Sequence, residues 1–369
     1  MFDDVITIVS DPLLSEFGPT RPVILMADEF RKRNFHVRVI SAKVVRNIRR
    51  LFKSKDVSVL SIDGETPERN ESLAWFKQWF AEALFSKNSR KISKLTDATL
   101  NFSNTIACPS KCWYAQGPPT VTLRNIKKGL DLHYRLVYSL ISKYLEILDI
   151  KSIKKFAGMS KITVTNSNYL KGIYSSFGVN VSHVVYPPLD CQFFCPKKSK
   201  ISFNYVLTYF GKETKLDVIK RLAEHEIDIL VFGGKTSAAP KWMLKHPKIK
   251  FLGRISNEKL VYLYSNALFT IYPFLDEPFG YIPIESMSCG TPVLTFDKQG
   301  PSETVIDGVT GWLVKNDKDM IKLAVRIWKE GYSSYMRKEC RSRALAFDKK
   351  EIAEKWIKLL SGIENLVVK

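Results

Sequence analysis

The sequence predicts an α/β protein made of two doubly wound parallel sheets in series. In the C-terminal half, apolar segments of strand character alternate with helical stretches, and the N-terminal half repeats this alternation less regularly. Such alternation is typical of a parallel sheet with helices on both faces. At 369 residues the chain is long enough for two such domains, each with its own core.

The strands expected in the C-terminal half are bounded by glycines and short polar turns. They lie at 204–211, 228–233, 249–253, 267–275 and 293–297. Helices are expected up to 222, over 257–267 and from 282 to 287. Parallel sheets of this kind bind ligands at the carboxyl ends of their strands. Four glycines fall at these ends: Gly211, Gly233, Gly253 and Gly280.

The N-terminal half is expected to follow the same plan. Strands are predicted at 5–10, 36–41, 57–63, 99–107 and 161–167. Helices are predicted at 22–34, over a long span that ends near 156, and in a short segment that ends at Gly178. The join is placed at 195–202, which gives predicted domains 1–195 and 196–349 and a final helical segment, 350–369.

The net charge of +20 predicts an anionic partner, which could be nucleic acid, lipid headgroups or a phosphorylated substrate. Residues 31–55 contain no acidic side chain at all. A solvated basic face is the alternative explanation of that run. A hydrophobic fraction of 45% with 25% charged residues is typical of a globular protein and excludes a disordered chain. The roughly 18 consecutive apolar residues of a spanning helix are not approached, so we expect a cytoplasmic chain that is not integral to the membrane.

Residues 71–92 carry many aromatic side chains. A helix there would bring seven large apolar side chains onto one broad face: Leu73, Trp75, Phe76, Trp79, Phe80, Leu84 and Phe85. Such a face followed by cations is typical of a helix that lies in a membrane surface, and an ordinary core helix is the alternative. Together with the basic run, it predicts contact with a membrane surface, at the inner face, through residues 31–92.

The six cysteines do not form the framework of a disulfide-rich protein. Cys108 with Cys112 and Cys191 with Cys195 have spacings that zinc sites use, but no Cys/His knuckle surrounds either pair. Incidental cysteines are the favoured interpretation, and zinc or disulfides stay as alternatives.

The segment 276–294, DEPFGYIPIESMSCGTPVL, holds the strongest functional signal. It places Glu277 and Glu285 at the two ends of a turn between a buried strand and a helix. The N–H groups of the first turn of such a helix can receive an anion, and Gly280 lets backbone approach a ligand. The pattern predicts a site for a phosphorylated, hydroxyl-rich ligand. A helix start favoured by the macrodipole alone is the alternative.

This segment, with 298–314 after it, resembles the E-x7-E signature of the family-4 glycosyltransferases. The resemblance implies the GT-B fold, with two Rossmann-like domains facing a central cleft, and a last helix that crosses back to the first domain. It implies that Glu277 contacts the donor sugar and Glu285 the ribose. The backbone of Phe279, Gly280, Tyr281 and Ile282 would contact the phosphates.

The same resemblance implies a cationic clamp after the first strand of the C-terminal domain. Lys212 and Lys215 are the candidates, in a spacing shorter than the family's usual one and with Lys where Arg is common. They would stabilise the departing diphosphate; ordinary surface lysines are the alternative. Arg254 and Ile255 would border the nucleobase, while Ser256 would cap the next helix.

Two N-terminal residues complete the candidates. Gly18 follows the first strand, where the family keeps a glycine-containing loop beside the donor phosphates. The family's usual N-domain histidine has no counterpart in 105–119, and His133, downstream, is the candidate on the acceptor side, with a surface or packing residue as the alternative. Asp317 and Asp319 form an Asp-x-Asp in a polar loop, where a helix cap is expected, so no metal or other cofactor is predicted.

The predicted function is transfer of a sugar from a nucleotide-diphosphate sugar to an acceptor hydroxyl, and family membership implies retention at the anomeric carbon. The basic run and the aromatic helix point to a lipid-linked or membrane-proximal glycan as acceptor. A nucleotide-sugar epimerase of related fold is one rival, and a basic nucleic-acid-binding protein is another, although no recognition motif accompanies the charge. Sugar, nucleobase, linkage and oligomeric state are not predicted.

Overall fold

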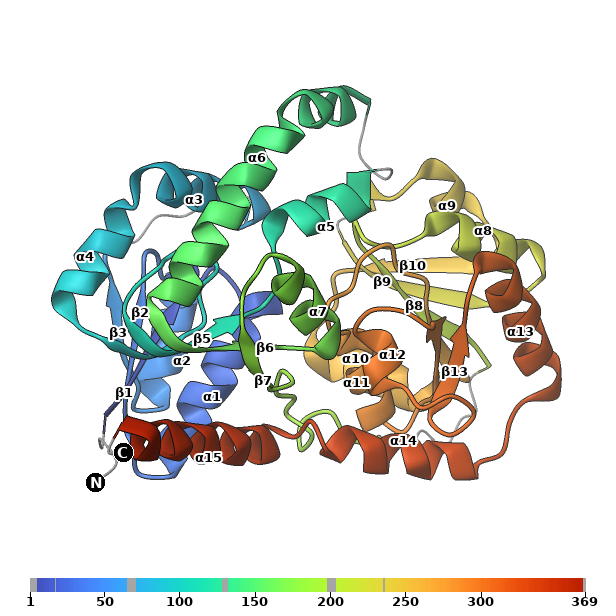
Figure 1. Ribbon diagram of the computed structural model, residues 1–369. Coiled ribbons are helices and arrows are strands. Elements are labelled where there is room, and N and C mark those ends of the chain that lie inside the picture. Colours follow the sequence, from blue (N-terminus) through green and yellow to red (C-terminus); the bar gives the residue numbers. More distant parts are fainter. Residues whose placement is uncertain are drawn as a thin grey trace. The chain divides into compact units, whose positions relative to one another are not determined.

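The computed structural model describes residues 5–16, 18–64, 71–127, 132–197, 204–234 and 236–367, without the side chains at 19, 71–73, 132–134 and 364–367 (Figure 1). The chain forms two compact units. The N-terminal unit comprises Met1–Arg124, Leu132–Pro188 and Lys349–Lys369, and the C-terminal unit comprises Asn125–Asp131 and Leu189–Asp348. The chain passes from the first unit to the second between Pro188 and Leu189. The join predicted from the sequence lies at 195–202.

The N-terminal unit is built on a parallel sheet of seven strands. In spatial order the strands are β3 (Ser58–Ser61), β2 (His36–Ser41), β1 (Val5–Ser10), β4 (Ala98–Asn101), β5 (Ser110–Ala115), β6 (Ser160–Thr165) and β7 (Val181–Val184). Its helices are α1 (Arg21–Lys32), α2 (Arg46–Ser54), α3 (Glu71–Phe85), α4 (Lys87–Leu95), α5 (Pro119–Ile126), α6 (Leu132–Gly158), α7 (Asn168–Ser176) and α15 (Lys349–Val367), with a 3-10 turn at Gly18–Thr20.

The C-terminal unit is built on a parallel sheet of six strands. In spatial order they are β10 (Ile249–Gly253), β9 (Ile229–Gly233), β8 (Val206–Phe210), β11 (Phe269–Tyr272), β12 (Val293–Phe296) and β13 (Gly311–Val314). The helices are α8 (Leu216–Glu224), α9 (Lys241–Lys245), α10 (Asn257–Asn266), α11 (Tyr281–Ser288), α12 (Pro301–Thr304), α13 (Asp317–Glu330) and α14 (Tyr335–Leu345), with a 3-10 turn at Thr236–Ala238.

Both sheets confirm the predicted doubly wound class. The strand order runs outward in two directions from one pair in each unit, β1 and β4 in the first and β8 and β11 in the second. Such a reversal leaves a crevice at the carboxyl ends of the two strands, because the connections leave toward opposite faces of the sheet. The topology thus marks one binding position in each unit.

The predicted helical span from about 108 to 156 was wrong in its first part. Residues Ser110–Ala115 form β5, which pairs with β4 and β6 in the interior of the sheet. Its apolar side chains Cys112, Trp113, Tyr114 and Ala115 are all buried, so the segment has the continuous apolar character of a strand covered on both faces.

The aromatic helix 71–92 also differs from its prediction. It is broken at Ser86, which adopts a left-handed conformation with φ of 50°, into α3 and α4. Trp79 is 1% exposed and packs in a cluster with Tyr138 and Leu145 of α6. The part of the face around Trp79 therefore packs as the core-helix alternative has it, whereas Leu84 and Phe85 are 39% and 65% exposed, and contact of this segment with a membrane surface stays a prediction.

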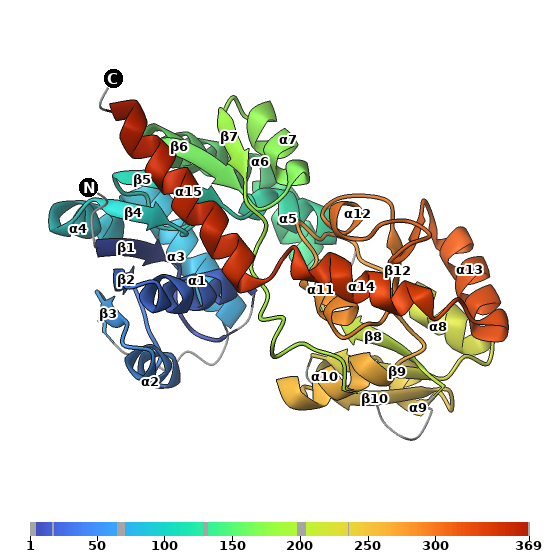
Figure 2. The ribbon, with the colours of Figure 1, turned by 90° about the horizontal axis from the view of Figure 1, so that it is seen from below.

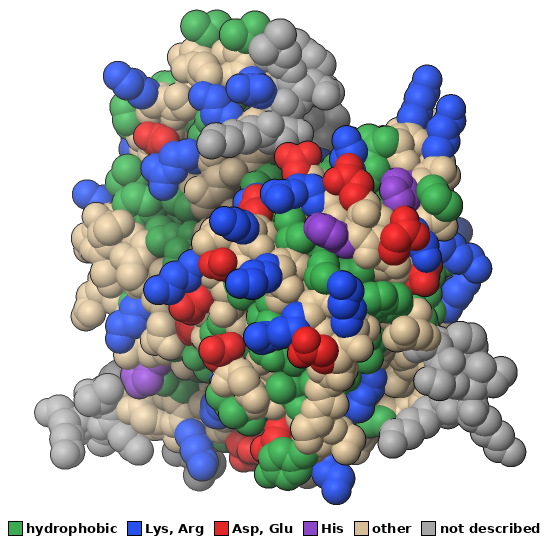
Figure 3. Space-filling model, turned by 90° about the vertical axis from the view of Figure 1, so that its right-hand side faces the viewer, with side chains coloured by type: hydrophobic (Ala, Val, Ile, Leu, Met, Phe, Trp, Pro, Cys, Tyr) green, Lys and Arg blue, Asp and Glu red, His purple; other side chains and the backbone are tan. Residues whose placement is uncertain are grey.

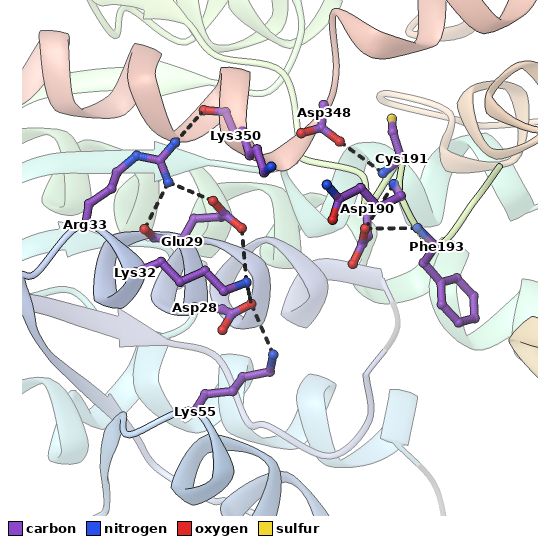
Figure 4. Close-up of polar contacts among 11 residues, drawn as sticks. Asp28, Glu29, Lys32, Arg33, Lys55, Asp190, Cys191, Phe193, Asp348 and Lys350 are labelled. Carbon is purple, nitrogen blue, oxygen red and sulfur yellow. Dashed lines mark hydrogen bonds and ion pairs between the residues drawn. The ribbon is translucent and has the colours of Figure 1, made fainter.

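Within the basic run 31–55, the cations at its two ends pair with carboxylates of their own unit. Lys32 and Lys55 both contact Asp28, at 2.7 and 3.1 Å, and these cations lower the pKa of Asp28 although burial acts to raise it. Arg31 pairs with Asp56. Figure 4 displays the Asp28 contacts beside those of Arg33.

The last helix, α15, packs into the core of the N-terminal unit. Trp356 is 1% exposed and packs against both Phe102 and Tyr114, with ring centroids 5.4 and 5.2 Å away. The guanidinium of Arg33, the residue after α1, donates to Glu354 Oε1 at 2.8 Å. It also donates to the carbonyl oxygen of Lys350 at 3.3 Å (Figure 4). Figure 2 shows α15 lying beside α1.

All six cysteines are free thiols, so the disulfide alternative was wrong. Burial raises the pKa of the Cys108 and Cys191 thiols to about 12. Within the described residues no cluster of three His, Cys, Asp or Glu side chains is arranged to hold a metal ion, and none of the described helices has the length and apolar character needed to cross a bilayer.

Candidate functional site in the C-terminal unit

The candidate site lies at the carboxyl ends of β8 and β11, the pair at which the strand order reverses. The loop after β8 runs against the loop after β11: the Lys215 N–H donates to the Pro273 carbonyl oxygen at 2.7 Å, and the Leu275 N–H donates to the Glu213 carbonyl oxygen at 2.5 Å. Gly211 is required here, because a Cβ on it would lie 2.3 Å from the Tyr209 ring. The sequence signals at Gly211 and at Glu277 therefore meet in space.

Glu277 is held by the turn that it begins. Its Oε2 accepts from the Tyr272 hydroxyl at 2.5 Å, and its Oε1 accepts from the Gly280 N–H at 3.0 Å. Burial raises the pKa of the carboxyl to about 7, and the nearby Glu213 adds to the rise. The carboxyl group therefore changes charge near neutral pH. A ligand that donates hydrogen bonds to it would stabilise the ionised form.

A second loop clamps the turn from the other side. The Glu277 N–H donates to the Gln299 side-chain oxygen at 2.7 Å, and the Gly300 N–H donates to the Glu277 carbonyl oxygen at 3.1 Å. The backbone of Gln299 is left-handed, with φ of 55°, a conformation that residues other than glycine rarely adopt. A Cβ at Gly300 would lie 2.2 Å from Phe279 Cα. The phosphate-facing backbone predicted at Phe279 to Ile282 is thus fixed before any ligand arrives.

Helix α11 begins at this clamp. Gly280 is its N-cap, with φ of 102°, and the helix runs over Tyr281–Ser288. The N–H groups of the first helical turn have no acceptor within the helix, so they point toward the loop and favour an anion. A Cβ at Gly280 would approach Pro301 at 3.2 Å, so glycine here supplies both the conformation and the room.

Glu285 lies one turn into α11 and is 4% exposed. Its Oε2 accepts from the Tyr264 hydroxyl of α10 at 3.1 Å. Tyr209 lies among the charges of the site, because Glu213, Glu277 and Glu285 all raise the pKa of its hydroxyl after burial, and Arg254 lowers it. The Tyr209 hydroxyl thus interacts electrostatically with both glutamates of the motif and with Arg254, the residue predicted to border the nucleobase.

The two candidate lysines behave differently. Lys212 is exposed at the end of β8. Lys215 lies over the Phe296 ring, with Nζ 5.1 Å from the ring centroid, and donates to Asp317 Oδ1 at 2.5 Å. Lys298, which the sequence did not single out, also lies over Phe296, at 5.0 Å, and burial and Lys215 lower its pKa. The cationic group at this edge is therefore Lys215 with Lys298.

The strand end at Gly253 has the predicted cap. Ser256 is the N-cap of α10 and its side chain accepts from the Lys259 N–H at 3.3 Å. Arg254 is exposed and Ile255 half-buried just before it. The cap expected at Asp317 and Asp319 was wrong by one residue: Asn316 accepts from the Asp319 N–H at 3.0 Å, and the two aspartates lie in the first turn of α13.

Two candidates are not part of the C-terminal unit. Gly18 is exposed in a 3-10 turn of the N-terminal unit, with φ of 60° and no atom within 4 Å of a Cβ built on it. His133 lies in the first turn of α6, and its side chain is outside the described residues.

A polar cluster at the β1 and β4 ends of the N-terminal unit was missed. Asp11 is 3% exposed, and its Oδ1 accepts from the Ser103 hydroxyl at 2.5 Å and from the Thr105 N–H and hydroxyl at 3.0 and 2.8 Å. Its Oδ2 accepts from the Trp75 ring N–H at 2.9 Å. A lone Asp after the first strand was the only signal in the sequence.

Comparison with known families finds a match within the C-terminal unit. Residues 208–345 match the model of the family described as glycosyl transferases group 1. Over this segment the chain is similar to the group 1 glycosyl transferases. The match begins in β8 and ends at the last residue of α14, so it contains Glu277, Glu285 and both lysines of the candidate clamp.

Curated relatives match over parts of the chain. The alpha-1,3/1,6-mannosyltransferase ALG2 of Mus musculus is 23% identical over 237 residues, which is 54% of each chain. The same enzyme of Neurospora crassa is 39% identical over 66 residues, 18% of this chain and 14% of that protein. A D-inositol 3-phosphate glycosyltransferase of Mycobacterium sp. (strain KMS) is 30% identical over 154 residues, 36% of this chain and 35% of that protein. The chain thus spans at most about half the length of these relatives.

Solved structures match over nearly the whole chain and share its fold, the predicted GT-B. Sucrose-phosphate synthase of Thermosynechococcus elongatus superposes with a TM-score of 0.71 at 15% identity, over 98% of this chain and 100% of that one. Alr3699/HepE of Anabaena, in complex with UDP-glucose, superposes with a TM-score of 0.70 at 16% identity, over 97% and 99%.

Proposed function

We propose that this protein is a group 1 glycosyl transferase, which transfers a sugar from a nucleotide-diphosphate sugar to an acceptor hydroxyl, with the donor bound in the C-terminal unit. The observation that carries the proposal is the clamp of 277–280 by Gln299 and Gly300, which presents the start of α11 beside the half-buried Glu277 and the buried Glu285. Such a site favours an anionic group on the helix end and hydroxyl groups on the carboxylates. Sucrose-phosphate synthase and HepE support it by sharing the fold, and HepE binds UDP-glucose.

Each residue has a proposed role toward that donor. Glu277 accepts hydrogen bonds from the sugar, Glu285 from the ribose, and the backbone from Phe279 to Ile282 faces the diphosphate. Lys215 and Lys298 stabilise the charge that grows on the diphosphate as the sugar bond breaks, and Lys212 reaches the same oxygens from solvent. No bound metal is required in this scheme, and the departing phosphate takes the acceptor proton, which fits retention of configuration.

The acceptor that we propose is a lipid-linked or membrane-proximal glycan, so that the protein works attached to a membrane surface without spanning it. The excess of basic residues supports an anionic surface as partner. WaaG, a glycosyltransferase of lipopolysaccharide biosynthesis, shares the fold with a TM-score of 0.68.

The experiment is a panel of nucleotide-diphosphate sugars, tested first for thermal stabilisation and then for turnover. We expect one donor to stabilise the protein. Glu285→Gln should lower the affinity for that donor by roughly tenfold or more, because a buried charge-assisted hydrogen bond is lost. Glu330→Gln, at the exposed end of α13, is the matched control and should leave the shift unchanged. Equal shifts in both variants would remove the assignment of Glu285.

The two rivals predict different results in the same assay. An epimerase would convert the donor without any acceptor, so release of an isomerised sugar in the absence of lipid extract would favour it. A nucleic-acid-binding protein would shift labelled DNA or RNA irrespective of donor. On the face of the molecule that Figure 3 displays, basic side chains alternate with acidic ones, which is unlike a continuous phosphate-binding track.

A further inference from the structure

Helix α6 presents a stripe of apolar side chains to solvent. Leu140 is 87% exposed, Ile147 is 65% exposed and Leu136 is 59% exposed. Val137, Tyr144 and Ile141 are also exposed, at 55%, 51% and 42%. Isolated exposed apolar residues are ordinary, but a run of them on one face marks an interaction surface. We call residues 136, 137, 140, 141, 144 and 147 the α6 stripe.

The α6 stripe continues along the same face as a group of cations. Residues 140, 144, 147, 151, 154 and 155 follow one another at spacings of three, four and one, which keeps them on one side of a helix. Lys151, Lys154 and Lys155 are exposed, as is Lys143 at the edge of the stripe. The charged side chains named on this face are all basic, and the face changes from apolar to cationic toward the end of α6 at Gly158.

A cavity of about 160 Å³ opens beside the cationic end. Lys151, Lys155, Leu84 and Ser86 line it, and Lys155 Nζ donates to the Ser86 hydroxyl at 2.7 Å. Thr105, which is bonded to Asp11, also lines it, so the cavity reaches the carboxyl end of β4. Its volume has room for a group of several heavy atoms.

One acidic side chain lines the same cavity, and its charge is already compensated. Glu82 is 6% exposed, and its two oxygens accept from the Asn88 and Ser89 N–H groups at 2.8 and 3.0 Å. These N–H groups belong to the first turn of α4, whose dipole favours a carboxylate. The two lysines therefore set the sign of the charge that the cavity offers to a ligand.

We propose that this face binds a membrane lipid that carries a phosphate group. The hydrocarbon chain lies along the α6 stripe, and the phosphate is held by Lys151 and Lys155 at the mouth of the cavity. The inference rests on the proposed function, because it places the lipid end of a lipid-linked acceptor beside the β1 and β4 ends of the N-terminal unit. Charge complementarity favours this occupant over a second copy of the chain, since two copies would bring their Lys143 and Lys151 side chains together in an apolar interface.

The test is sedimentation with vesicles of phosphatidylcholine, with and without phosphatidic acid, on the full chain in the absence of donor. The protein should prefer the vesicles that contain phosphatidic acid. Lys151→Gln with Lys155→Gln should lower binding to these by about fivefold per lysine, and leave binding to pure phosphatidylcholine unchanged. Leu140→Glu with Ile147→Glu should remove binding to both. Inorganic phosphate alone should compete weakly, because it lacks the chain.

The matched controls lie in the C-terminal unit. Leu244→Glu changes a leucine that is 44% exposed, and Lys322→Gln with Lys329→Gln changes two exposed lysines of α13. The proposal is overturned if these controls lower vesicle binding as much as the α6 variants, or if the α6 variants bind like the unchanged protein. It is also overturned if the protein is a dimer that Leu140→Glu dissociates without any effect on vesicles.

Donor-induced stabilisation of the same variants separates this inference from the proposed function. The α6 variants should keep the full donor shift, because the donor site is built within the C-terminal unit; denaturant unfolding like that of the unchanged protein establishes that the N-terminal unit of these variants folds. Glu285→Gln should lose the shift and keep vesicle binding. If no nucleotide sugar stabilises any variant while phosphatidic acid binding depends on Lys151 and Lys155, the lipid site stands and the proposed function fails.

Discussion

The two units use the same strand reversal in opposite ways. In the N-terminal unit the reversal is filled by Asp11, a carboxylate whose oxygens are occupied by hydroxyl, backbone and indole donors of its own unit. In the C-terminal unit it is framed by glycines, by Glu277 with a pKa of about 7, and by Lys215. A saturated carboxylate fixes loops, whereas a carboxyl poised between charge states can respond to a ligand. One topology thus yields a fixed junction in one unit and a responsive site in the other.

The largest expected effect comes from breaking the backbone clamp of the responsive site. Gly300→Ala places a Cβ 2.2 Å from Phe279 Cα, so the loops must separate. We expect a loss of about 3 kcal/mol in unfolding free energy and complete loss of donor stabilisation. Denaturant unfolding and the donor shift measure the two effects. Gly172→Ala, in α7 with no atom near the new Cβ, is the control and should leave both unchanged or slightly improved.

Breaking the fixed junction should cost slightly less and act differently. Asp11→Ala leaves buried donors on Ser103, Thr105 and Trp75 without their acceptor, which we expect to lower the unfolding free energy by roughly 2 to 3 kcal/mol. The donor shift in the C-terminal unit should persist. Asp97→Ala, an exposed residue before β4, should change stability by less than about 0.5 kcal/mol. A donor shift lost together with Asp11 would argue against the contrast.

The pH dependence of stability should reveal the responsive carboxyl. Because the folded pKa of Glu277 lies above its value of 4.5 in the unfolded chain, the unfolded state releases this proton first as pH rises. The contribution is full below pH 4.5 and is lost as pH rises to about 7, by roughly 2 kcal/mol after allowance for partial exposure.

The comparison that isolates this term is Glu277→Gln. Its melting temperature, measured from pH 4 to 8 as a difference from the unchanged protein, should rise relative to that protein through this window. Parallel curves would mean that the carboxyl titrates normally. Saturating donor should flatten the difference, since bound hydroxyl groups stabilise the ionised form.

The smallest effect should come from the strand end at Gly253. Ser256→Ala removes the cap of α10 and should cost about 1 kcal/mol with little change in donor affinity. Ser334 is the N-cap of α14 without a side-chain hydrogen bond, so Ser334→Ala is a matched control and should cost less than half as much. Thermal unfolding resolves the difference. A large loss of donor affinity in Ser256→Ala would assign the turn a direct part in the site.

Much of the fold was predictable, because strands covered on both faces leave apolar runs that end at glycine. The apolar run of β5 is short and lies between Pro109 and Gly117. These two residues are typical of turns, so the segment did not stand out as a strand. The burial of Trp79 was not predictable. An amphipathic pattern indicates that one face of a helix will be covered, but it does not identify the element that covers it. Here α6 covers it, from about sixty residues further along the chain.

The candidate site was predictable where its residues are neighbours in sequence. Glu277, Gly280 and Glu285 lie on one turn and its helix, so their spacing carried the signal. Gln299 and the pairing of Lys215 with Asp317 join segments separated by 22 and 102 positions. No local pattern specifies such partners, because the sheet topology brings them together.

The position of α15 has a consequence for how the chain folds as it is synthesised. Its residues Ile352, Trp356 and Leu360 belong to the same core as Ile6, Ile8 and Val39. This core therefore cannot be completed until the whole of the C-terminal unit has left the ribosome. The unit that is synthesised first therefore completes its core last. Until then the nascent N-terminal sheet exposes an apolar face that chaperones can recognise. Moving the α15 sequence ahead of β1 by circular permutation should shorten that wait.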